Sequence, residues 1–74
     1  MTRLPAVRPE RAIGVLLKMG YIIDHQTGSH VILYKEAHIP ITVPRHNREL
    51  KRGTLHHILQ SAGLSVDEFI RLLR

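Results

Sequence analysis

The apolar residues of this 74-residue chain change their spacing twice, from helical to alternating and back to helical, and this limits the folds that it can adopt. A first helix is predicted to begin near Pro9, because proline suits the first helical position. Its apolar residues form a wide stripe at helical spacing, made by Ala12, Ile13, Leu16 and Leu17. Gly20 is a stop signal for this helix.

Three short β-prone segments follow, at Tyr21–Ile23, Val31–Tyr34 and Ile39–Val43. Gln26–Gly28 is predicted as a turn, and Lys35–His38 connects the second and third segments as a hairpin. Pro40 and Pro44 bracket the third segment. Because proline cannot donate to a strand ladder, we expect this strand at a sheet edge.

The helical spacing returns after Gly53-Thr54, with apolar residues at Leu55, Ile58, Leu59 and Ala62. Gly63 ends this helix, and Ser65 with Glu68 forms a capping box for a third. The predicted fold class is α+β, with the order α-β-β-β-α-α and helices packed on one face of a three-stranded antiparallel sheet. Residues 1–8 are predicted as a tail and residues 9–74 as a single domain.

The hydrophobic pattern also selects a register for the hairpin. If its turn centres on Ala37, Val31 lies opposite Val43 and Leu33 opposite Ile41, so four apolar side chains share one face. A slip of one residue would expose this set.

In this register His30 points to the opposite face and lies opposite Pro44, next to Arg45-His46. Two histidines and an arginine are therefore predicted to converge at one end of the sheet.

The charge of the chain points to a polyanionic partner, since 11 Lys and Arg outweigh 6 Asp and Glu and give a net charge of +5. Cysteine is absent, which excludes disulfides and thiolate metal sites. No apolar run approaches the roughly 20 residues that cross a bilayer. The N-terminus lacks the apolar stretch of a signal peptide. We therefore expect a cytoplasmic protein with no membrane partner.

Several motifs resemble those of the HicA toxins, and they are Gly28-Ser29-His30, Thr42–His46, Glu49–Leu55 and Ile58–Leu64, with Leu16–Tyr21 upstream. The likeness runs from about Leu4 to Leu73. It implies a fold like the double-stranded-RNA-binding domain and a ribonuclease that cleaves messenger RNA. It also implies neutralisation by a HicB antitoxin and a catalytic role for His30. Thr27 departs from the family pattern, because many members carry a basic residue there.

The chemistry implied is feasible for such a small chain. RNA supplies its own nucleophile, the 2′-hydroxyl, so cleavage to a 2′,3′-cyclic phosphate needs a base, an acid and positive charge at the phosphorus. Histidine can serve as base or acid near neutral pH. His30 is predicted to fill one role, and His46 is a candidate for the other. No metal or cofactor is required.

The remaining candidates are RNA-binding groups. Gly28 would let the backbone approach a phosphate, with Ser29 beside it in the motif. Arg45 supplies positive charge. Lys51 and Arg52 do the same before a helix start at Gly53-Thr54, whose free amides attract anions. The structural alternatives are a solvated strand residue for His30 and a capped helix start with solvated charges at 51–54.

The other histidines can be explained without a catalytic role. His46 is as well explained as a loop histidine that orients the backbone, and His56 and His57 sit on the polar face of a helix. His25 and His38 have no assigned role, with surface placement as the default. No histidine pair has the spacing of a zinc site.

Three other functions remain open at this level. A non-catalytic RNA-binding module would share the charge and the fold without needing His30. A DNA-binding regulator would use the last two helices as a helix-turn-helix, although Asp67 and Glu68 at the start of the reading helix would be repelled by phosphates. An inactive relic of a toxin is the third.

Overall fold

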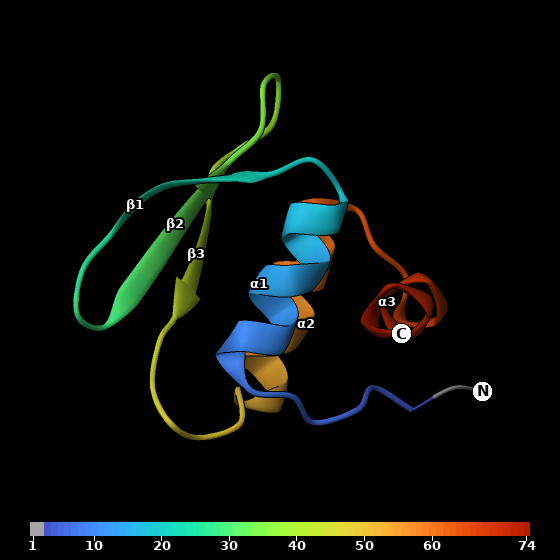
Figure 1. The fold of residues 1–74 in the computed structure, drawn as a ribbon. Coiled ribbons are helices and arrows are strands. Elements are labelled where there is room, and N and C mark those ends of the chain that lie inside the picture. The colour runs from blue at the N-terminus through green and yellow to red at the C-terminus, as the bar shows by residue number, and fades with distance from the viewer. Residues whose placement is uncertain (1–2) are drawn as a thin grey trace.

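The computed structural model describes residues 3–74, and its elements follow the predicted order. They are α1 (Pro9–Lys18), β1 (Ile22–Gln26), β2 (His30–Tyr34), β3 (Ile41–Pro44), α2 (Arg52–Ala62) and α3 (Val66–Leu73). The strands form one antiparallel sheet in the order β1-β2-β3, so β3 is an edge strand as predicted. Figure 1 shows α1 and α2 on one side of the sheet, with α1 in front of α2 in this view, and α3 beyond them. Both α1 and α2 contact β3. The α+β fold class is confirmed.

The predicted hairpin register is also confirmed. Val31 pairs with Val43 and Leu33 with Ile41. All four side chains are buried against the helices, with at most 3% of any of them exposed. Ala37 adopts a left-handed conformation (φ 65°) at the centre of the turn, where the register requires it. The inner face of β2 and β3 therefore forms the sheet side of the hydrophobic core.

Each of the three strands differs from its predicted range by a few residues. β1 begins at Ile22 because Tyr21 is buried ahead of the strand, at the end of α1. β3 begins at Ile41, since Ile39 lies in the exposed hairpin connection and Pro40 has no N–H for the ladder. β1 also continues to Gln26, which moves the predicted turn by one residue, to residues 27–29. β2 begins at His30 and β3 ends at Pro44, each one residue beyond its predicted range. Tyr21 and Ile39 have high β propensity, but propensity alone did not show that they lie just outside the strands.

The helix ends follow the predicted signals. Gly20 (φ 98°) and Gly63 (φ 71°) take the positive φ that ends a helix. Ser65 and Glu68 form the capping box of α3. Hydrogen bonds from Ser65 lower the pKa of Glu68. The box therefore stabilises α3 at neutral pH and is lost as the pH falls through that lowered pKa.

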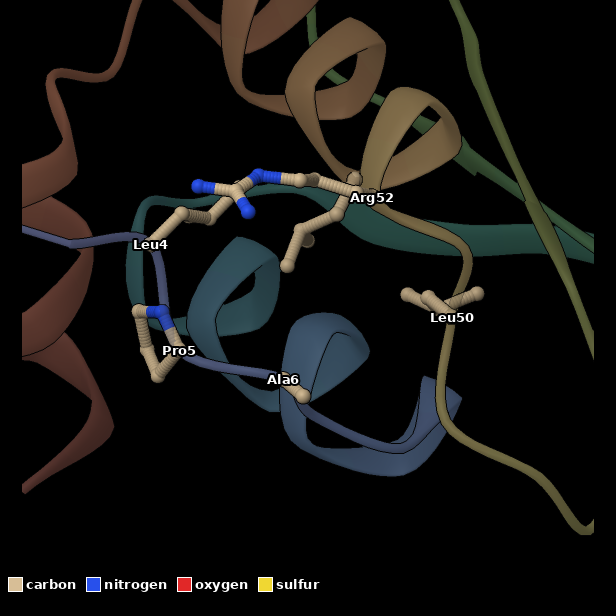
Figure 2. Close-up of a pocket in the computed structure, with 6 residues that line it drawn as sticks. Leu4, Pro5, Ala6, Leu50 and Arg52 are labelled. Atoms are coloured by element: carbon tan, nitrogen blue, oxygen red, sulfur yellow. The ribbon is translucent and has the colours of Figure 1, made fainter.

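The N-terminal segment is more closely packed than the predicted tail, of which residues 1–2 lie outside the described part. Residues 3–8 have no regular secondary structure, yet Val7 is buried and Leu4 packs against the core. The Leu50 amide donates to the Val7 carbonyl at 2.8 Å. Figure 2 shows Leu4, Pro5 and Ala6 beside Arg52 at the start of α2. No helical or alternating period marks this segment, so the sequence alone did not reveal its packing.

Tyr21 carries the one buried side-chain polar atom that lacks a hydrogen-bond partner within residues 3–74. Its ring is 2% exposed and lies edge-on to His38, with Lys35 Nζ 5.7 Å from the ring centroid. A buried unpaired hydroxyl costs about 1–3 kcal/mol. We therefore expect Tyr21→Phe to leave the free energy of unfolding unchanged or raise it by about 1 kcal/mol, measured by urea denaturation. A clear decrease would show that the hydroxyl bonds a buried water.

The longest helix of residues 3–74, α2, has 11 residues. None of the described helices is both long and apolar enough to cross a bilayer.

Candidate functional site

The turn between β1 and β2 holds the Gly28-Ser29-His30 motif in place through Thr27. The Thr27 hydroxyl Oγ1 accepts hydrogen bonds from the amides of Ser29 (3.3 Å) and His30 (3.1 Å). The Thr27 amide donates to the His30 carbonyl at 2.8 Å. A Cβ placed on Gly28 would meet nothing within 4 Å, so the outside of this turn is open. Hydrogen bonds to Thr27 therefore hold the backbone of the motif in place, while its outer surface stays accessible to a ligand.

His30 begins β2 and points to the outer face of the sheet, away from the helices. It pairs with Pro44 as predicted, and its side chain is exposed. Its Nδ1 lies 3.0 Å from the Ser29 hydroxyl. The Arg45 amide donates to the Ser29 carbonyl at 2.7 Å, which joins the motif to the segment after β3. The imidazole thus stands at the predicted end of the sheet, open to solvent.

Arg45 is close to the motif through its main chain, but its side chain turns the other way. Its Nη1 donates to Gln26 Oε1 at 2.8 Å, and Gln26 pairs with the inward-facing Val31. Arg45 and Gln26 line a groove between the sheet and α1. The main chain of Arg45 therefore lies next to the motif as predicted, but its guanidinium group does not point toward His30.

His46 lies in the loop after β3 and is exposed. Its Nδ1 accepts a hydrogen bond from the Arg48 amide at 3.2 Å, so the ring orients the loop backbone. When Nδ1 accepts in this way, a neutral imidazole carries its proton on Nε2. His46 shares no hydrogen bond with His30 among the described residues.

The start of α2 has the features of an anion-binding helix end. Lys51 is its N-cap and makes no side-chain cap, and the first turn contains no acidic residue. The first helical hydrogen bond runs from the Leu55 amide to the Lys51 carbonyl, so the amides of Arg52, Gly53 and Thr54 have no acceptor within the helix. Lys51 and Arg52 are exposed, while Thr54 is half-buried. α1 and α2 begin at the same end of the molecule, where the loop after β3 also passes (Figure 1).

One pair of polar residues that the sequence left without a role lies on the same sheet face as His30. The ladder between β1 and β2 shifts register between Ile23 and His25, which leaves Asp24 as an extra residue. Asp24 Oδ2 lies 3.0 Å from His25 Nδ1. In a regular strand, adjacent side chains point to opposite faces, so only the bulge lets this pair meet. No sequence signal marks the bulge.

Removal of the Thr27 hydroxyl is expected to loosen the motif. Thr27→Val keeps the shape of the side chain and removes the acceptor that both amides use. Because the turn is exposed, those amides can bond water, and we expect stability to fall by at most about 1 kcal/mol. The amide hydrogens of Ser29 and His30 should exchange faster in NMR, and Thr27→Ser should restore their protection. Unchanged exchange in Thr27→Val would show that the hydroxyl does not support the turn.

No group of three or more His, Asp or Glu side chains in residues 3–74 is arranged to hold a metal ion.

Comparison with known protein families identifies this chain's family. A family model described as the HicA toxin of bacterial toxin-antitoxin systems matches residues 10–64, which is more than half of the chain. The matched range contains the Gly28-Ser29-His30 motif, the loop after β3 and the whole of α2. No protein with curated annotation matches the chain.

Proposed function

The chain belongs to the HicA toxin family of bacterial toxin–antitoxin systems, and on that premise we propose that it is an endoribonuclease that cleaves messenger RNA with His30 as a proton-transfer group. The observation that carries the proposal is the supported turn. His30 is exposed, its backbone is fixed by Thr27, and the Arg45 amide joins the motif to the loop after β3. Such a fixed yet accessible imidazole suits acid or base catalysis.

The proposed reaction needs nothing beyond the chain and the RNA. A base removes the proton of the 2′-hydroxyl, the 2′-oxygen attacks phosphorus, and an acid protonates the departing 5′-oxygen. The products are a 2′,3′-cyclic phosphate and a 5′-hydroxyl. The free amides and cations at the start of α2 supply a place for a neighbouring phosphate of the RNA.

The test is cleavage of a defined single-stranded RNA by the purified protein, with the products identified by mass spectrometry. We expect products ending in a 2′,3′-cyclic phosphate, no cleavage where the scissile nucleotide is 2′-deoxy, and the same rate in EDTA. An RNA that binds yet stays intact would contradict the proposal and support a non-catalytic RNA-binding module. Inhibition by EDTA would contradict a metal-independent reaction.

RNA binding should weaken when the cations at the start of α2 are removed. For a single strand, removing one cation that binds a phosphate is expected to reduce the slope of log K against log salt by about 0.7. The double variant Lys51→Ala, Arg52→Ala should therefore reduce it by about 1.4, measured by fluorescence anisotropy between low and physiological salt. Arg74→Ala, at the far end of α3, is the matched control. An unchanged slope would show that Lys51 and Arg52 do not contact the RNA phosphates.

A toxin of this family acts with an antitoxin, and we propose that a HicB-like protein neutralises this one. Co-expression with a HicB-like reading frame adjacent to the gene is expected to restore growth and to yield a complex on purification. Growth arrest that persists although both proteins are made would contradict the pairing.

A further inference from the structure

The bulge in β1 creates an oriented histidine next to the proposed site. Asp24 is the extra residue of the bulge, and its Oδ2 lies 3.0 Å from His25 Nδ1. A carboxylate in this position holds the imidazole as the tautomer with its proton on Nδ1, which leaves the lone pair of Nε2 free. The His25 side chain is 62% exposed, so this nitrogen is accessible to a large substrate.

The strand register places His25 on the same face as His30. His25 pairs with Ile32, and His30 precedes Ile32 by two residues on β2. Residues related in this way are diagonal neighbours, about 7–8 Å apart between Cα atoms and within reach of the same bound group. The side chains on this outer face that can ionise are His25, His30 and Tyr34, with Asp24 beside His25. β3 contributes Thr42 and Pro44, which do not ionise.

We propose that His25, oriented by Asp24, is the general base that takes the proton from the 2′-hydroxyl, and that His30 is the acid that protonates the leaving 5′-oxygen. This rests on the proposed ribonuclease function. The bond from the 2′-oxygen to phosphorus forms as the bond from phosphorus to the 5′-oxygen breaks. One proton passes to His25 Nε2 and one leaves His30. An in-line displacement puts the base and the acid on opposite sides of the phosphorus, which suits two imidazoles separated across neighbouring strands.

His46 is less suited to the role of base. Its Nδ1 accepts from the Arg48 amide, so the neutral ring presents an N–H at Nε2. His25 has the reverse arrangement, with its Nδ1 held by a carboxylate. The second proton-transfer group is therefore assigned to β1 and not to the loop after β3.

The variants should fold, because an exposed ion pair contributes little to stability. His25→Ala is expected to slow single-turnover cleavage by about 10²–10⁴-fold, as for removal of a general base. His38→Ala is the matched control. His38 is also exposed and its Nδ1 is also bonded, to the Glu36 carbonyl, but it lies in the hairpin connection away from the site. This variant should cleave at the wild-type rate.

The two roles are separated by a substrate whose leaving 5′-oxygen is replaced by sulfur, since a thiolate leaves without being protonated. This substrate should restore rapid cleavage to His30→Ala and leave His25→Ala slow. Asp24→Asn should lower kcat by less than His25→Ala does, with KM unchanged. A merely structural role for His25 would not produce this dependence on the leaving group.

Three outcomes would overturn the assignment. One is wild-type cleavage by His25→Ala alongside a slow His30→Ala, which leaves the ribonuclease proposal intact. Another is sulfur rescue of His25→Ala in place of His30→Ala, which reverses the roles. The third is a folded wild-type protein that cleaves no RNA, which removes the proposed function together with this inference.

Discussion

Replacement of His30 by alanine is expected to lower the rate of RNA cleavage by about 10²–10⁴-fold and to abolish growth arrest when the toxin is expressed. The decrease follows from the removal of a proton-transfer group. It should not follow from unfolding, because the bonds that hold the turn use the His30 main chain. The His30 side chain itself is bonded to the Ser29 hydroxyl, at 3.0 Å. Single-turnover cleavage under enzyme excess measures the effect, and circular dichroism checks the fold.

Ser29→Ala distinguishes the contribution of the His30 imidazole to cleavage from that of the neighbouring Ser29 hydroxyl. This variant keeps His30 and removes the hydroxyl next to Nδ1, so cleavage should fall by much less than in His30→Ala. The Arg45 amide still has its acceptor, because the Ser29 carbonyl is unchanged. If His30→Ala cleaved as fast as the wild type, the proposed catalytic role of this motif would be wrong. Equal decreases in the cleavage rates of Ser29→Ala and His30→Ala would indicate that both substitutions act by changing the conformation of the turn.

The parts of the fold that could be predicted are those that a local pattern determines. Four apolar residues on β2 and β3 can be buried together in only one register, and that register by itself places His30 opposite Pro44. The glycines at 20 and 63 and the capping box at Ser65 each carry a local conformational signal. The family resemblance was carried by short motifs, and the matched range 10–64 confirms the family.

The parts that could not be predicted depend on contacts between segments that are distant in the sequence, or on an irregularity with no signature. The direction of Arg45 is set by Gln26, 19 residues away. The packing of Val7 is set by the main-chain bond from Leu50. The bulge at Asp24 breaks the alternation on which strand prediction relies, so His25 could only be assigned to the surface. In each case the fold brings groups together that no spacing rule relates.

The largest expected effect on stability is at Phe69. Its side chain is 1% exposed and is the buried residue through which α3 joins the core. The rest of the α3 attachment includes polar bonds: Arg11 donates to the Leu73 carbonyl at 3.0 Å, and Lys18 donates to the carbonyls of Leu72 (2.6 Å) and Arg74 (3.0 Å). These three bonds are exposed and compete with water, so they cannot replace a buried aromatic ring.

Phe69→Ala should therefore lower the free energy of unfolding by about 3–5 kcal/mol. A chain of this size has roughly 4–11 kcal/mol in total, so the variant should lose a large part of its stability and unfold at a much lower urea concentration than the wild type. Urea denaturation followed by circular dichroism measures the decrease, and Arg71→Ala, exposed on the same helix, should change stability by less than about 0.5 kcal/mol. If α3 were only an appendage, Phe69→Ala would release that helix alone. Amide protection would then disappear in residues 66–73 and persist in β2, whereas integration into the core predicts that both become unprotected together.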